Sequence, residues 1–160
     1  MTVEDLRDEV SLELQSLETT VREALGLRRD VAGREATVRE RTAAAAFLAQ
    51  FYGGVENILK RLCRFHAVAM PTGETWHVEL YQRFCAPGGP LLPILFDEKL
   101  AAAFSGYRKF RHVVHHGYSL QLDWARIGEG IDGLEQAFSG FRMQLECYLA
   151  SLEHGRSGAD

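Results

Sequence analysis

Residues 38–66, VRERTAAAAFLAQFYGGVENILKRLCRFH, decide the fold. Apolar side chains recur there every three or four residues, which is the period of one helix face. The repeat is nearly a heptad, and its members are Val38, Thr42, Ala45, Ala49, Tyr52, Val55, Leu59, Leu62 and His66. So long an apolar face needs other helices to cover it. The stretch therefore predicts a helical bundle or a coiled-coil-like pair.

Four other segments have helical patterns. Residues 3–25 repeat apolar positions by threes and fours, and we expect Gly26 to end that helix. Asp97 is expected to cap a helix that ends at Gly117, and residues 127–152 follow an uninterrupted 4-3-4-3 repeat. Residues 74–84 read as a short helix before an irregular loop rich in Pro and Gly. The whole pattern predicts an all-α fold, an antiparallel bundle of four main helices plus one short helix.

The composition is that of one globular domain. The chain has 160 residues, of which 46% are hydrophobic and 25% charged, enough for a core without metals or disulfides. We expect one helical domain over residues 1–153 and a flexible polar tail over 154–160. The three cysteines form no zinc or disulfide pattern, and no signal peptide or membrane-spanning run is evident. These features predict a cytoplasmic protein that does not enter a membrane.

The segment 107–118 carries the strongest functional signal. In a chain with a formal net charge of -4, it holds three fixed cations, three histidines and no acid: Arg108, Lys109, Arg111, His112, His115 and His116. Such a cluster attracts phosphate. An arginine, an imidazole and the phenol of Tyr118 close together at a helix end are suited to handling a phosphodiester. Cations also complement the dipole at a helix C-terminus, which explains part of the pattern without any function.

Helix geometry constrains how these groups can act together. On a straight α-helix a separation of five residues turns two side chains about 140° apart and lifts them about 7.5 Å. Arg111 therefore faces His115, at i and i+4, rather than His116. A site that uses both Arg111 and His116 needs a kinked helix end or a second copy of the helix. A twofold dimer with two such helix ends apposed would supply the second copy.

The competing chemical interpretation is a metal site. His112, His115 and His116 share one helix face with spacing that zinc accepts. No carboxylate or thiol lies nearby in the sequence, however, and the adjacent basic side chains would repel a dication. We therefore predict no metal and no cofactor. Elsewhere, His66 and His77 read as isolated, satisfied histidines, and Glu56 with Lys60 reads as an ordinary i, i+4 ion pair.

Three stretches of the sequence resemble one known family. Arg111, His116 and Tyr118 form the pattern Arg-x4-His-x-Tyr, which is similar to the signature of HepT toxins, ribonucleases of the HEPN superfamily. The flanking segment 104–123 is the closest match, and segments 51–62 and 73–80 look like two earlier parts of the same family. The likeness spans about residues 38–152 and implies a HEPN-like bundle.

The resemblance also implies an activity and its residues. HepT toxins are metal-independent endoribonucleases whose active cleft forms across a homodimer. Arg111 and His116 match the catalytic positions, Tyr118 completes the signature, and His112, Arg108 and Lys109 would line the cleft. A minimal nucleotidyltransferase antitoxin silences such toxins by transferring AMP to the signature tyrosine, here Tyr118. The tandem of His115 and His116 departs from the family pattern and leaves the choice of catalytic imidazole open.

The resulting hypothesis is a toxin of a toxin–antitoxin pair that cleaves RNA by attack of the ribose 2′-hydroxyl. His116 would move a proton, Arg111 would stabilise the transition state, and Tyr118 would bind a phosphate oxygen. The alternative is a non-catalytic helical interaction module that binds the nucleotidyltransferase without cutting RNA. No feature of the helical pattern excludes this second hypothesis.

Overall fold

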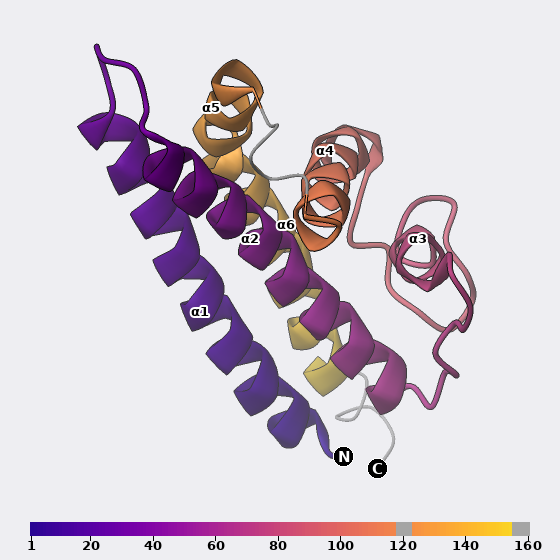
Figure 1. Cartoon of the computed structure of the whole chain (residues 1–160). Coiled ribbons are helices and arrows are strands. Elements are labelled where there is room, and N and C mark those ends of the chain that lie inside the picture. The colour runs from indigo at the N-terminus through magenta and orange to yellow at the C-terminus, as the bar shows by residue number, and fades with distance from the viewer. Residues whose placement is uncertain (118–122, 155–160) are drawn as a thin grey trace.

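The computed structural model of the chain describes residues 1–117 and 123–154, and in that part it is all-helical (Figure 1). Its elements, in order, are α1 (Val3–Asp30), α2 (Val38–Phe65), α3 (Trp76–Gln82), α4 (Glu98–His115), α5 (Trp124–Asp132) and α6 (Leu134–His154). The described residues hold no strand beyond an isolated bridge between Cys85 and Phe96. The predicted all-α bundle is therefore confirmed. None of the described helices is long and apolar enough to cross a membrane.

The two long helices α1 and α2 form an antiparallel hairpin that is the base of the bundle. Each begins with a capping box, in which a threonine hydroxyl and an acidic side chain bond each other's backbone N–H groups: Thr2 with Asp5, and Thr37 with Glu40. These caps satisfy N–H groups that a helix start leaves unpaired. α3 and α4 pack on α2 on the side away from α1, whereas α6 packs against α1 and α4 (Figure 1).

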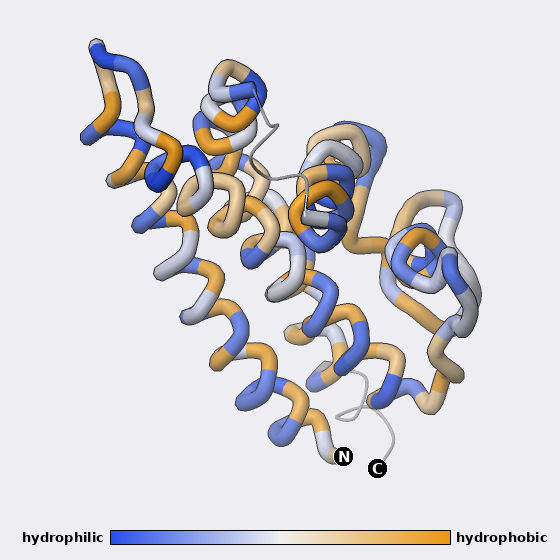
Figure 2. Tube along the Cα trace, in the orientation of Figure 1, coloured by the Kyte–Doolittle hydropathy of each residue, from blue (hydrophilic) through white to orange (hydrophobic). Residues whose placement is uncertain are grey.

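The apolar stripe of α2 lies in the centre of the core. Phe51 is fully buried, and its ring contacts those of Phe104, Tyr107 and Phe138 at centroid distances of 5.7, 5.1 and 6.4 Å. One ring of α2 thus joins α4 to α6. Apolar positions recur along every long helix at the helical period (Figure 2). Burial of this stripe supplies most of the driving force for folding.

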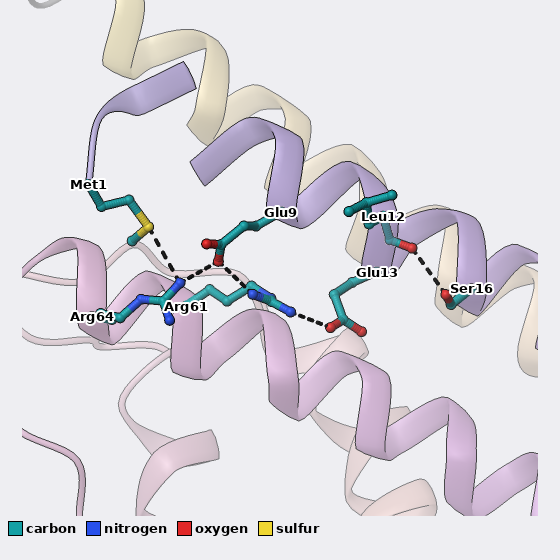
Figure 3. Close-up of polar contacts among 7 residues, drawn as sticks. All are labelled: Met1, Glu9, Leu12, Glu13, Ser16, Arg61 and Arg64. Carbon is teal, nitrogen blue, oxygen red and sulfur yellow. Dashed lines mark hydrogen bonds and ion pairs between the residues drawn. The ribbon is translucent and has the colours of Figure 1, made fainter. Parts of the chain in front are cut away.

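A cluster of ion pairs fixes the register of α1 against α2 (Figure 3). The guanidinium of Arg61 donates to Glu9 at 2.5 Å and to Glu13 at 2.7 Å, one turn further along α1. Arg64 donates to the same carboxylate of Glu9 and approaches the sulfur of Met1 at 3.6 Å. Because the two acids and the two arginines are each about one turn apart, sliding either helix would break several bonds together.

The structure departs from the sequence prediction at two helix ends. α1 continues through Gly26 to Asp30, so the predicted stop at Gly26 is wrong. The last predicted helix is divided into α5 and α6 at Gly133. There the Tyr107 hydroxyl donates to the carbonyl oxygen of Gly130 at 2.8 Å, and a Cβ on Gly133 would lie only 3.1 Å from that hydroxyl. A side chain inserted at a helical backbone is a recognised cause of a break.

Other predicted boundaries are confirmed. The Asp97 side chain accepts from the backbone N–H of Leu100 at 2.8 Å and so caps α4. α4 ends at His115, and Gly117 follows with a φ of 77°, a conformation that glycine adopts without strain. Of the predicted tail 154–160, only His154 belongs to the described residues, as the last residue of α6. The extent of the single domain stays a prediction.

Two adjacent glycines of α2 give a matched test of helix packing. A methyl group on Gly53 would meet nothing within 4 Å, whereas one on Gly54 would lie 2.7 Å from Cδ2 of Leu17 on α1. We expect Gly53→Ala to raise the free energy of unfolding by about 0.5–1 kcal/mol, because alanine favours the helix. Gly54→Ala should gain less or destabilise. Urea denaturation of both variants checks this, and an equal gain would contradict the α1–α2 packing described here.

Candidate active site

The Arg111 guanidinium lies between α4 and α2. Its side chain is 18% exposed, and its Nη2 lies 3.3 Å from Oε1 of Glu56 on α2. Glu56 is 1% exposed, and among residues 1–117 and 123–154 it is the single charged residue that is buried. A buried carboxylate requires opposite charge and hydrogen bonds to offset the loss of water. Glu56 therefore has a structural reason to hold Arg111.

Two further side chains reach the same carboxylate. The Lys60 ammonium, one turn along α2, lies 3.4 Å from Oε1 of Glu56, and Nδ1 of His77 on α3 lies 2.7 Å from Oε2. The rings of Trp76 and His77 are 3.4 Å apart between centroids, and the Lys60 ammonium lies 4.8 Å from the centroid of Trp76. Side chains from α2, α3 and α4 thus converge on one carboxylate.

A cavity of about 350 Å³ opens beside this cluster, between α2 and α4. Its polar lining consists of Gln50, Glu56, Asn57, Lys60, Arg111 and His115, and Ala46, Ala49, Gly53 and Val114 complete the wall. Because Ala46, Ala49 and Gly53 on α2 are small, they leave open the cavity that Arg111 lines from α4. The guanidinium of Arg111, the ammonium of Lys60 and the side-chain amides are hydrogen-bond donors that suit an anionic ligand such as phosphate, whereas the Glu56 carboxylate only accepts.

The two histidines at the end of α4 have different surroundings. His115 lines the cavity with Arg111, as the i, i+4 spacing predicted. Burial lowers the pKa of His115, and the positive charge of Arg111 lowers it further, against a smaller opposite effect of Glu56. This environment favours the neutral imidazole, which can accept a proton.

His116 follows the last residue of α4 and lies apart from that cavity. Its Nδ1 is 2.8 Å from the carbonyl oxygen of His112, and the two rings are 4.1 Å apart between centroids. Within one chain the structure therefore brings His115 to the cavity that Arg111 lines, whereas His116 contacts His112. In the described part of the chain, no group of three or more His, Cys, Asp or Glu side chains is arranged to hold a metal ion.

The other two predicted cleft residues point in different directions. Arg108 is half-buried near Tyr52, and its positive charge acts on that phenol. Lys109 is exposed and lines a separate, larger groove of about 780 Å³ over α4, α5 and α6. That groove is largely apolar, and neither Arg111 nor a histidine lines it. It therefore lacks the groups that are predicted to act on a phosphodiester. Tyr118 lies outside the described residues.

Several buried polar atoms around Arg111 are unpaired. Tyr52 Oη, Arg108 Nε and Arg111 Nε each lack a hydrogen-bond partner in the described part of the chain. Burial raises the pKa of Tyr52, and the nearby Glu56 raises it further, whereas Arg108 and Arg111 act in the opposite direction. Native proteins pair most buried polar groups.

The sequence did not predict that Glu56 and His77 lie beside Arg111. Glu56 does pair with Lys60, as expected, but it also binds Arg111 and His77. A signal was present, since Glu56 lies four residues after Tyr52 and three before Leu59, both on the apolar stripe. An acid on a buried helix face requires a partner. His77 carries no such signal, because its partner is on another helix.

One comparison with known proteins decides the family. The sequence model of a family described as HepT-like protein matches residues 43–152. The chain belongs to the HepT-like family. The match runs from the first turns of α2 almost to the end of α6 and includes Glu56, His77, Arg111 and His116, whereas α1 precedes it. No curated protein and no solved structure matches the chain. This HepT-like chain is thus a member of the HEPN superfamily with an all-helical fold.

Removing the buried carboxylate should destabilise the HepT-like fold. Glu56→Ala leaves Arg111 and His77 without their acceptor, so we expect the free energy of unfolding to fall by about 2–4 kcal/mol. Glu146→Ala is the control, because Glu146 pairs with Arg142 at the surface of α6 and such pairs contribute about 0.5 kcal/mol. Urea denaturation measures both. Equal, small effects would contradict a structural role of the carboxylate.

Proposed function

We propose that this HepT-like protein is the toxin of a toxin–antitoxin pair and acts as a metal-independent endoribonuclease. The observation that supports the proposal is the cavity in which Arg111 and His115 lie beside the buried Glu56. Membership of the HepT-like family supports it as well, because the family is nuclease-related. RNA is the proposed substrate, since the chemistry uses its 2′-hydroxyl.

The proposed reaction is transfer of the scissile phosphate to the neighbouring 2′-oxygen. An imidazole at the end of α4, His116 by the family spacing, accepts the 2′-hydroxyl proton. The 2′-oxygen then attacks phosphorus, the bond to the 5′-oxygen breaks, and the products are a 2′,3′-cyclic phosphate and a 5′-hydroxyl. Arg111 stabilises the negative charge that grows on the phosphate oxygens. DNA lacks the nucleophile and should stay intact.

The proposed active form is a homodimer. Arg111 and His116 lie on different sides of α4 within one chain, so a second copy of the helix end would bring a partner's imidazole to the cavity. Regulation is proposed through Tyr118, which a minimal nucleotidyltransferase antitoxin would modify with AMP. The added anion would compete with RNA phosphate for the cationic cleft.

The test uses total RNA in excess EDTA with purified protein whose Tyr118 is shown by mass spectrometry to be free of AMP. We expect the wild type to cut RNA and to leave 2′,3′-cyclic phosphate ends. Arg111→Ala and His116→Ala should cut about 10²–10⁴-fold more slowly. Arg39→Ala is the control, because Arg39 is an exposed arginine at the first turn of α2.

The outcomes separate the competing hypotheses. His115→Ala belongs to the same series, since loss of cleavage in this variant with normal His116→Ala would move the imidazole role to the residue that shares the cavity with Arg111. Intact RNA with unmodified wild-type dimer would contradict the nuclease. The non-catalytic module that binds the nucleotidyltransferase would then be favoured. Expression of the chain alone gives a second readout, because a nuclease arrests growth and a binding module does not.

A further inference from the structure

We propose that His77, oriented by Glu56, is the proton donor to the leaving 5′-oxygen. The inference rests on the proposed ribonuclease function and adds a residue from α3 to it. The observation that carries it is the Glu56 carboxylate, which binds the His77 imidazole through one oxygen and the Arg111 guanidinium through the other.

The chemistry requires a second proton-transfer group. Attack by the 2′-oxygen releases one proton to a base, and departure of the 5′-oxygen takes up one proton from an acid. Arg111 cannot be that acid, because a guanidinium does not lose its proton in proteins. A single imidazole serves both steps only when it reaches both oxygens, which lie on opposite sides of phosphorus in an in-line reaction. A second imidazole from another element removes this constraint.

The geometry of His77 fits this role. Its Nδ1 lies 2.7 Å from Oε2 of Glu56, so Nδ1–H donates to the carboxylate and Nε2 is left to exchange a proton with a substrate. A carboxylate that holds an imidazole in this way fixes its tautomer and stabilises its cation, as in the hydrolytic triads. The His77 side chain is 29% exposed, whereas Glu56 is buried, so the imidazole has access to ligand and its partner does not.

His77 belongs to the same electrostatic cluster as the cavity. It is close enough to interact electrostatically with His115, which lines the cavity with Arg111. The ionisable groups that face it are Glu56 and Lys60 from α2, and Arg111 and His115 from α4. The Trp76 ring lies against the imidazole at a centroid distance of 3.4 Å. His77, the proposed acid, and Arg111, which stabilises the transition state, thus bind different oxygens of the Glu56 carboxylate.

The proposed step balances. The base at the end of α4 gains the 2′-hydroxyl proton, the bond between phosphorus and the 2′-oxygen forms, and the bond to the 5′-oxygen breaks. His77 gives its Nε2 proton to the 5′-oxygen, so the product chain leaves as an alcohol rather than as an alkoxide. After the step the base carries one extra proton and His77 lacks one. Both return to their starting states by proton exchange with water.

The decisive variant is His77→Gln, compared with His66→Gln. A glutamine amide still donates to Glu56 but cannot transfer a proton. His66 is a half-buried histidine that contacts the Tyr148 hydroxyl outside the cavity, so it controls for loss of an imidazole. Melting temperature is measured for both variants. We expect His77→Gln to lower kcat/KM on an RNA oligonucleotide at least about 100-fold. His66→Gln should leave kcat/KM unchanged.

A second substrate separates proton donation from positioning. A ribonucleoside 3′-(p-nitrophenyl phosphate) has a leaving group that departs without protonation. His77→Gln should cleave it within about threefold of the wild-type rate, whereas loss of the base, in His116→Ala or His115→Ala, should slow both substrates.

Three results would overturn the inference in distinguishable ways. His77→Gln that cuts RNA like the wild type removes the role of His77 and leaves the proposed function standing. Equal losses on the RNA and on the activated substrate make His77 a positioning residue rather than the acid. Wild-type protein that cuts neither substrate removes the proposed function, and the role of His77 with it.

Discussion

The buried carboxylate of Glu56 is the interaction on which the rest of the structure depends. At 1% exposure it has no water to solvate it, so its charge must be met by protein. The groups that meet it come from α2, α3 and α4, and they are Lys60, His77 and Arg111. One carboxylate therefore links three helices that the apolar core also packs together. It also places the arginine beside a cavity, which a purely apolar contact would not do.

The remainder of the bundle supports this polar centre. The α1–α2 hairpin is held by its apolar stripe and by the pairs of Arg61 and Arg64 with α1, so α2 presents Glu56 from a rigid element. On α4, Phe104 and Tyr107 anchor the helix in the core while Arg111 faces the cavity. Functional groups on packed helices are positioned more accurately than groups on loops.

The fold was largely predictable because it depends on local periodicity. Each correctly predicted feature depends on residues that are close together in the sequence. These features are the apolar stripe of α2, the Asp97 cap and the end of α4 before Gly117. The facing of Arg111 and His115 followed from helix geometry. The break at Gly133 did not, because Tyr107 causes it from a distant helix while the apolar repeat continues across it. His77 was missed for the same reason, since its partner Glu56 is close only in space.

The most direct test of this account is a double-mutant cycle between Glu56 and Arg111. Glu56→Gln, Arg111→Gln and the double variant are unfolded in urea, and the coupling free energy is taken from the four values. We expect a coupling of about 1 kcal/mol or more, because Glu56→Gln removes the anion that faces the half-buried guanidinium, and Arg111→Gln leaves the buried carboxylate with Lys60 and His77 alone. Single effects that add within about 0.5 kcal/mol would contradict it. Glu56 would then not be what holds Arg111 at the cavity.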